Sequence, residues 1–234
     1  DYVFVADQWG AHGGQSANLY LINGTNGDEI WRYGTSSRSI TSTGISANGD
    51  YIVASTDNKI LYLFEKDSDS PLWTYEFSCE DEEQCSNDSG GTKSVISKNG
   101  EYIAACWNSI LYYFSIESST PIFHTEQRTY WNEEGGCPSI SGDGKYIAAN
   151  NNKLNFYDCS EDYDYCDYDG VVEPVWYYES DDEGNIQVAE ISESGEYIVL
   201  SGTENIHLFG SDDNTPIWTF AESNGGTNDA SISA

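Results

Sequence analysis

The stretch GISANGDYIVAS, residues 44–55, decides the fold of this chain. Two short apolar segments flank Asn48-Gly49, a dipeptide that is favoured in tight hairpin turns because both residues tolerate a positive φ. The flanking segments alternate with a period of two and contain β-branched residues, which is typical of β-strands. The stretch therefore predicts an antiparallel hairpin.

The same hairpin recurs along the whole chain, which is the sign of repeated structural units. Its first strand appears as GISANG, SVISKNG, PSISGDG and AEISESG, and its second as DYIVAS, EYIAAC, KYIAAN and EYIVLS. An alternating strand such as KILYLFE follows each hairpin, and a strand such as PLWTY follows that. Four antiparallel strands that repeat every 40–50 residues or so are typical of propeller blades.

The segment LYLINGTNGDEIWRY, residues 19–33, resembles the pyrroloquinoline-quinone-type propeller repeat, with its Thr-x-Gly turn and its Trp docking position. The other units are similar to the PQQ-like or WD40-like repeats of secreted archaeal proteins. The resemblance covers essentially the full length and implies an all-β fold, a five-bladed β-propeller of four-stranded antiparallel blades. It implies little about activity, because propellers serve many functions.

One blade is expected to be split between the two ends of the chain. The second-strand sequence DYVFVA stands at residues 1–6, and its natural prefix, SISA, stands at residues 231–234. An open sheet edge needs partners for its backbone groups, so the two segments are expected to pair. The paired residues would be Ser231, Ile232 and Ser233 with Tyr2, Val3, Phe4 and Val5. The expected units of this single domain are residues 1–37, 38–78, 92–128, 136–180 and 186–222, with 229–234 completing the first.

Two geometries would form this pairing. The tail strand can return to its own first blade and close a ring, which effective concentration favours when the ends can meet. Alternatively it adds a strand to the next molecule, and this heterologous contact builds an open filament. A third alternative is that the chain is an excerpt of a longer propeller. The chain has no methionine and no signal peptide, so we expect a mature product whose export signal, if any, has been removed.

Charge excludes one class of partner. The chain has 40 Asp and Glu against 9 Lys and Arg, for a net charge of −31. This balance repels phosphate backbones, so no nucleic-acid partner is expected. It suits a medium rich in cations or protons, which reduce self-repulsion. No apolar run approaches the roughly 18 residues of a membrane-spanning helix, so no membrane span is expected.

Six cysteines in an acidic chain favour an oxidising, extracellular or cell-surface location. Two acidic loops are each bracketed by a cysteine pair, and local pairing of these would leave the two remaining cysteines for each other. The expected disulfides are Cys79–Cys85, Cys159–Cys166 and Cys106–Cys137. Sequons at Asn23 and Asn87 are candidate glycosylation sites.

The stretch EDYDYCDYDG, residues 161–170, is the candidate metal site. Oxygen ligands at alternating positions before a turn glycine suit Ca²⁺. The candidate ligands are Asp162, Asp164, Asp167 and Asp169. The alternative is a solvated acidic insertion, and no other cofactor is expected.

Nothing in the sequence favours catalysis. No HExxH, GxSxG or P-loop pattern occurs. His12 is the one loop-borne candidate for a functional histidine, whereas His124 and His207 occupy strand positions used for packing. A tryptophan stands at one position of most units, at Trp31, Trp73, Trp176 and Trp218, with Phe123 in the third. A ring in every unit favours packing between blades over a carbohydrate or quinone platform.

These observations together predict a non-enzymatic extracellular scaffold, structural or adhesive, that associates with itself. The filament form would join copies by β-strand complementation between C-terminal and N-terminal segments. The alternative is a closed monomeric propeller that binds a glycan or peptide at its central face.

Overall fold

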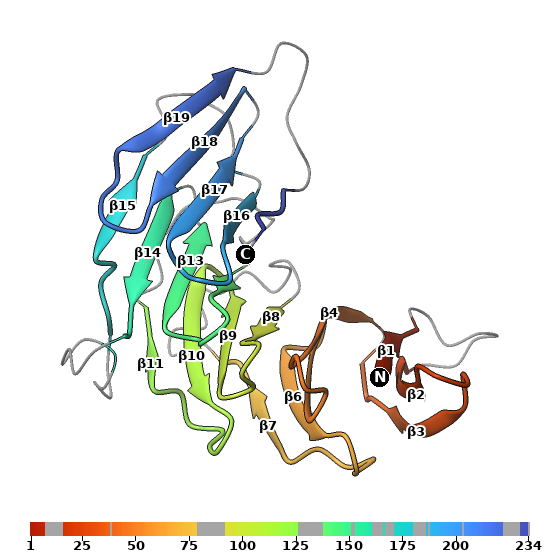
Figure 1. Cartoon of the computed structure of the whole chain (residues 1–234). Coiled ribbons are helices and arrows are strands. Elements are labelled where there is room, and N and C mark those ends of the chain that lie inside the picture. Colours follow the sequence, from red (N-terminus) through yellow and green to blue (C-terminus); the bar gives the residue numbers. More distant parts are fainter. Residues whose placement is uncertain are drawn as a thin grey trace.

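The computed structural model describes residues 1–7, 16–37, 39–78, 92–125, 138–150, 153–160, 166, 171–179, 186, 188–202, 204–221 and 230–233. In these ranges the chain is all-β, with nineteen strands and no helix. The strands form five antiparallel sheets, four of four strands and one of three (Figure 1). We name the sheets blades 1 to 5 in chain order.

Each blade is a meander of consecutive strands. Blade 1 comprises β1 (Tyr2–Ala6), β2 (Asn18–Asn23) and β3 (Glu29–Gly34). Blade 2 comprises β4 (Ile40–Ile45), β5 (Tyr51–Thr56), β6 (Ile60–Glu65) and β7 (Trp73–Glu76). Blade 3 comprises β8 (Lys93–Ile96), β9 (Tyr102–Trp107), β10 (Ile110–Ser115) and β11 (Phe123–His124). Blade 4 comprises β12 (Ser139–Ile140), β13 (Tyr146–Asn150), β14 (Leu154–Asp158) and β15 (Trp176–Tyr178). Blade 5 comprises β16 (Val188–Ile191), β17 (Tyr197–Ser201), β18 (Asn205–Gly210) and β19 (Pro216–Ala221).

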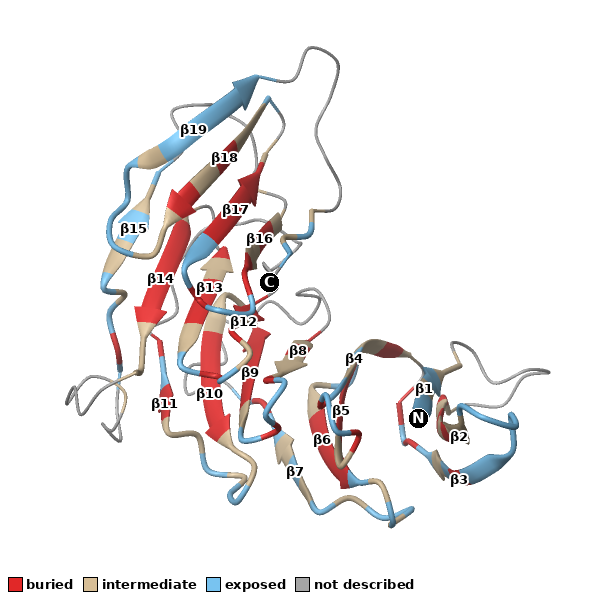
Figure 2. Ribbon diagram, in the orientation of Figure 1, coloured by how far each residue is buried: buried red, intermediate tan, exposed pale blue. Residues whose placement is uncertain are grey.

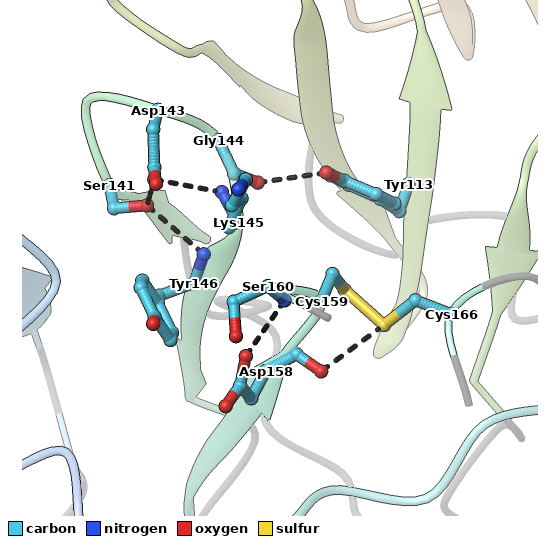
Figure 3. Close-up of a disulfide and its surroundings, with 10 residues drawn as sticks. All are labelled: Tyr113, Ser141, Asp143, Gly144, Lys145, Tyr146, Asp158, Cys159, Ser160 and Cys166. Carbon is cyan, nitrogen blue, oxygen red and sulfur yellow. Dashed lines mark hydrogen bonds between the residues drawn. A yellow bond between two sulfur atoms is a disulfide. The ribbon is translucent and has the colours of Figure 1, made fainter. Parts of the chain in front are cut away.

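In each of blades 2 to 5, a serine at the same repeat position closes the first hairpin. In blade 4, Ser141 N donates to Tyr146 O at 2.9 Å, and Tyr146 N donates to Ser141 Oγ at 3.0 Å (Figure 3). Ser46, Ser97 and Ser192 make the same exchange with the tyrosine that opens the next strand. A short polar side chain that satisfies a backbone donor explains why serine recurs at this position.

The turn glycine of each of these hairpins is required by its neighbours. Gly195 has φ +77°, which favours glycine, and a Cβ there would lie 2.3 Å from Cδ2 of Tyr146 in the preceding blade. Gly144 has φ +81° and meets Tyr102 in the same way. The recurring Tyr-opened strand and Gly turn therefore form one contact between consecutive blades.

Tryptophan packs between blades, as the sequence predicts. Trp31 of blade 1 stacks on Phe64 of blade 2, with ring centroids 5.4 Å apart. Its indole N–H donates to Lys66 O at 2.8 Å, across the junction. Phe123 holds this place between blades 3 and 4 and contacts Tyr157, at 6.1 Å. Each junction thus combines an aromatic ring, buried or half-buried, with the apolar faces of two sheets.

The blades follow one another along an arc whose two ends do not meet (Figure 1). Blade 1 lies at one end, beside blade 2 alone, and blade 5 lies at the other. Among the described residues, Ala230 to Ser233 form no strand, and blade 1 keeps three strands. The described part of the chain therefore shows an open arc (Figure 1), and the intrachain ring expected as one alternative is not shown.

Candidate assembly interface

Blade 1 has an incomplete inner edge. β1 pairs with β2, from Tyr2 opposite Asn23 to Ala6 opposite Leu19, and with no other strand in the described part of the chain. The equivalent strands β5, β9, β13 and β17 each pair on both sides, because β4, β8, β12 and β16 cover them. Blade 1 thus lacks the innermost strand that the other four blades have.

Apolar side chains of β1 are exposed on the face that points away from blade 2, whereas Phe4 and Ala6, on its other face, pack against blade 2. Val3 is 50% exposed and Val5 is 41% exposed. Ile52 and Ala54 hold the same positions in blade 2 and are fully buried. Figure 2 shows the contrast between pale blue β1 and red segments of β9 and β17. Burial of a Val side chain is worth about 1.5 kcal/mol or more, so this face of β1 favours a covering partner.

The tail lies elsewhere in the same chain. Ile232 lines a cavity of about 260 Å³ together with Ile96, Ile140 and Ile191, which belong to the inner strands of blades 3, 4 and 5. Ser231 and Ser233 are exposed. Within one chain the structure therefore does not bring the expected assembly strand to Tyr2, Val3, Phe4 and Val5, because Ile232 finds apolar cover nearer to blade 5.

Ser233 matches the hairpin serines by sequence. SISA aligns with the GISA that opens residues 44–47, so Ser233 corresponds to Ser46. Ser46 and its equivalents in blades 3, 4 and 5 are buried and bonded to the following strand, whereas Ser233 is exposed. Ser233 thus aligns with the buried hairpin serines but takes part in no hairpin among the described residues.

Blade 5 exposes a second apolar face that sequence analysis did not predict. Trp218 is 46% exposed and Phe220 is 60% exposed, although each holds a position that packs between blades elsewhere in the chain. Both lie on β19, the outer strand of the last blade (Figure 2). The place of Trp218 in the chain could have predicted this exposure, because Trp218 belongs to the last unit and no described blade follows it.

Asp7 fixes the end of β1 against β2. Its carboxylate accepts hydrogen bonds from Asn18 N at 2.5 Å, from Asn18 Nδ2 at 3.0 Å and from the Tyr20 hydroxyl at 3.0 Å. Burial raises the pKa of Asp7, but the hydrogen bonds from Asn18 and Tyr20 outweigh burial, so its pKa lies below the ordinary value. The charged form therefore stabilises blade 1.

This predicts acid sensitivity in blade 1. A carboxylate whose folded-state pKa is depressed stabilises the fold above its unfolded-state pKa, near 4, and loses that contribution as pH falls through the lower folded-state value. We expect Asp7→Asn to lower the unfolding free energy by about 1 kcal/mol at pH 7 and to flatten its decline in acid. Thermal unfolding between pH 2 and pH 7 measures both effects. Asp212→Asn, at an exposed turn of blade 5, is the control, and an equal change there would contradict a specific role for Asp7.

One predicted disulfide is confirmed. Cys159 and Cys166 are bonded, with Cα atoms 5.5 Å apart, at the end of blade 4 (Figure 3). Cys106 is buried in β9, and its predicted partner Cys137 lies outside the described residues, as do Cys79 and Cys85. The pairings Cys106–Cys137 and Cys79–Cys85 stay predictions.

The candidate calcium ligands, Asp162, Asp164, Asp167 and Asp169, lie outside the described residues. Elsewhere, the described part of the chain has no group of three or more His, Cys, Asp or Glu side chains that suits a metal ion. Asn23 ends β2, where its Oδ1 accepts a hydrogen bond from Thr25 N at 2.8 Å, whereas Asn87 and His12 are not described. The buried His207 lies 2.9 Å from Thr219 Oγ1, in a packing position.

Comparison with known proteins finds no family model that matches this chain and no curated protein of similar sequence. Among the described residues, no helix has the length and hydrophobicity needed to cross a bilayer. The two exposed faces of the arc are therefore the candidate functional surfaces of this chain.

Proposed function

We propose that this chain is a non-catalytic extracellular structural protein, a filament subunit whose tail completes blade 1 of the next copy. The observation that carries the proposal is a three-stranded blade with exposed Val3 and Val5, in a chain that holds the matching strand sequence at its far end. The assembled blade would then have the split, four-stranded form expected of a propeller repeat.

The register of the donated strand follows from the complete blades. Ile45 lies opposite Ile52, and Gly44 lies opposite Val53. Ile96 and Ile191 face an isoleucine in the same way in blades 3 and 5. The same register puts Ile232 of one copy opposite Val3 of the next, and Ser231 opposite Phe4. The apolar side chain of the tail thereby meets the exposed apolar edge.

Hydrogen bonds of the hairpin serine would fix the same register. Ser233 would donate its N–H to Tyr2 O of the next copy and accept a hydrogen bond from Tyr2 N at its hydroxyl. Blades 2 to 5 all contain this exchange, so it is the chain's own way of joining its first two strands. Backbone pairing gives affinity, and the serine and isoleucine positions give specificity.

The chain between blade 5 and the tail is long enough for this connection. Residues 35–39 join β3 to β4 across one internal junction, and residues 222–229 form a longer segment. A contact between the tail of one copy and the head of another is heterologous, and it propagates when the rotation does not close. The open arc favours propagation over closure.

Two further features support an extracellular location. The Cys159–Cys166 disulfide is of the kind that persists in oxidising compartments. A net charge of −31 keeps a protein soluble and discourages side-by-side adhesion of its surfaces. Both features suit a fibre that is exposed to the medium.

Electron microscopy of the purified chain tests the proposal. We expect regular fibres from the chain, and folded, monomeric arcs after removal of residues 230–234. Ile232→Asp should likewise abolish fibres, because it sets a charge against Val3, whereas Ile232→Val is the matched control and should keep them. Fibres that persist without the tail would contradict strand donation. A monomer that loses thermal stability without its tail would instead favour the closed propeller.

A further inference from the structure

Three of the four internal junctions between blades share one design that the outer face of blade 5 repeats. Trp31, Trp73 and Trp176 each donate the indole N–H to a backbone carbonyl of the next blade. The acceptors are Lys66 O at 2.8 Å, Ile116 O at 2.7 Å and Ser211 O at 2.9 Å. Trp218 holds the same position on β19, and its N–H has no acceptor in the described part of the chain.

The acceptor residue has a fixed place in each blade. It directly follows the third strand of its blade, and its N–H donates to the residue before the second strand: Lys66 to Asp50 O, Ile116 to Glu101 O and Ser211 to Glu196 O. Gly24 has this place in blade 1, because it follows β2 and donates its N–H to Asp1 O at 2.9 Å. Within the described residues no donor reaches the Gly24 carbonyl oxygen.

A second aromatic ring accompanies each tryptophan. Tyr33 and Tyr75, two residues after their tryptophans, meet Phe64 and Phe114 edge to face with centroids 5.1 Å apart. Tyr178 meets Phe209 at 4.9 Å in the same arrangement. Phe220 has this position in blade 5.

The receiving face in blade 1 is also uncovered. Phe64, Phe114 and Phe209 stand one residue before the end of their strands and are fully buried. Ile22 has the same place in β2 and is only half-buried, and so is Tyr20 on the same side of the strand. Leu19 and Leu21, on the opposite side, are buried against blade 2. Blade 1 is therefore complete toward blade 2 and open on its other side.

We propose that blade 5 of one copy docks on blade 1 of the next copy as a further junction of the same kind, with the Trp218 indole N–H donating to Gly24 O. The Trp218 ring lies against Ile22, and Phe220 lies against Tyr20 and Ile22. The occupant is a second copy because the two exposed faces carry an aromatic anchor and an apolar acceptor side at the same repeat positions as the two sides of the internal junctions. This inference rests on the proposed function and adds a rigid contact to the donated strand.

The added contact changes the fibre that is expected. Strand donation alone pairs the tail with β1 of the next copy and fixes no contact between blade 5 and blade 1. A docked junction repeats the internal geometry, so blades would follow at an even spacing through the boundary between copies. The aromatic anchors resemble the residues that dominate binding energy at protein interfaces.

Variants of the full chain with an intact tail test the docking. We expect Trp218→Ala to raise the critical concentration for assembly about thirtyfold or more, because it removes a large interface anchor. Trp218→Phe keeps a ring but loses the donor, and should raise it about fivefold. Ile217→Ala, at the adjacent exposed residue on the other side of β19, should leave it unchanged. Sedimentation at a series of protein concentrations measures these values, with Phe220→Ser as a second variant should Trp218→Ala lower the melting temperature.

The outcomes separate the docking from the strand donation. Fibres of Trp218→Ala and Phe220→Ser with wild-type critical concentration and even spacing would overturn the docking, while loss of fibres on tail removal would leave the donation standing. Fibres unaffected by either change would overturn both. A monomer whose Trp218 fluorescence is already shielded from a soluble quencher would show closure within one copy, which also overturns docking on a second copy.

Discussion

A chain that carries its tail strand ahead of Asp1 is expected to be a monomer that forms no fibres. In this permuted chain, residues 227–234 and an added Asn-Gly precede Asp1, and the C-terminus follows residue 226. The addition restores the turn that Asn48-Gly49 provides in blade 2, between Ala47 and Asp50. The strand would then pair with its own β1, because a linked strand has a local concentration in the millimolar range.

The permuted chain should also be more stable than the monomeric chain without its tail. The strand pairs with the open backbone edge of β1 and places Ile232 beside Val3, which adds about 1–3 kcal/mol to the free energy of unfolding. Light scattering after gel filtration measures the mass, and thermal unfolding measures the stability. The permuted chain with Ile232→Asp is the control and should lose the added stability. Permuted chains that form fibres at the wild-type concentration would show that assembly does not need the open edge.

Trp73→Ala should lower the free energy of unfolding by about 3–5 kcal/mol. The indole ring lies 5.7 Å from Phe114, and its N–H donates to Ile116 O at 2.7 Å. The substitution therefore leaves a cavity between blades 2 and 3 and removes the donor from a partly buried carbonyl. Urea unfolding of the monomeric chain without residues 230–234 measures the loss.

The same substitution at Trp218 gives the matched comparison. In a monomer this ring has no blade to pack against, so Trp218→Ala should change the unfolding free energy by less than about 0.5 kcal/mol. Tryptophan at this repeat position would then have two roles: Trp73 stabilises the monomer, and Trp218 stabilises the assembly. Equal losses at Trp73 and Trp218 would mean that blade 5 is covered within its own chain.

Local features of the fold follow directly from the sequence. Asn48-Gly49 predicts the turn of the first hairpin, and a turn lies there, although Gly49 alone of the pair has a positive φ, of +76°. Trp31, Trp73 and Trp176 pack between blades, as their repeat position predicts. These features depend on residues near in sequence or one repeat apart, which a periodic pattern specifies.

The course of the whole arc does not follow from the sequence. Closure depends on the angle at each junction, which is set by the packing of many side chains from two sheets rather than by the repeat pattern. The tail sequence identifies Ile232 as a strand residue. The same alternation of side chains suits pairing within one chain and pairing between two chains, so the pattern does not distinguish them. The Cys159–Cys166 bond was predictable because its loop is short, whereas the calcium ligands and two other disulfides stay predictions.

The unequal ends of the arc give any fibre built from it a direction. At one extremity the last subunit presents the open strand edge of blade 1, and at the opposite extremity it presents the tail and an uncovered Trp218. Fragments can therefore rejoin in one orientation alone. A short peptide with the sequence of residues 227–234 would plug one extremity and leave the other free to grow.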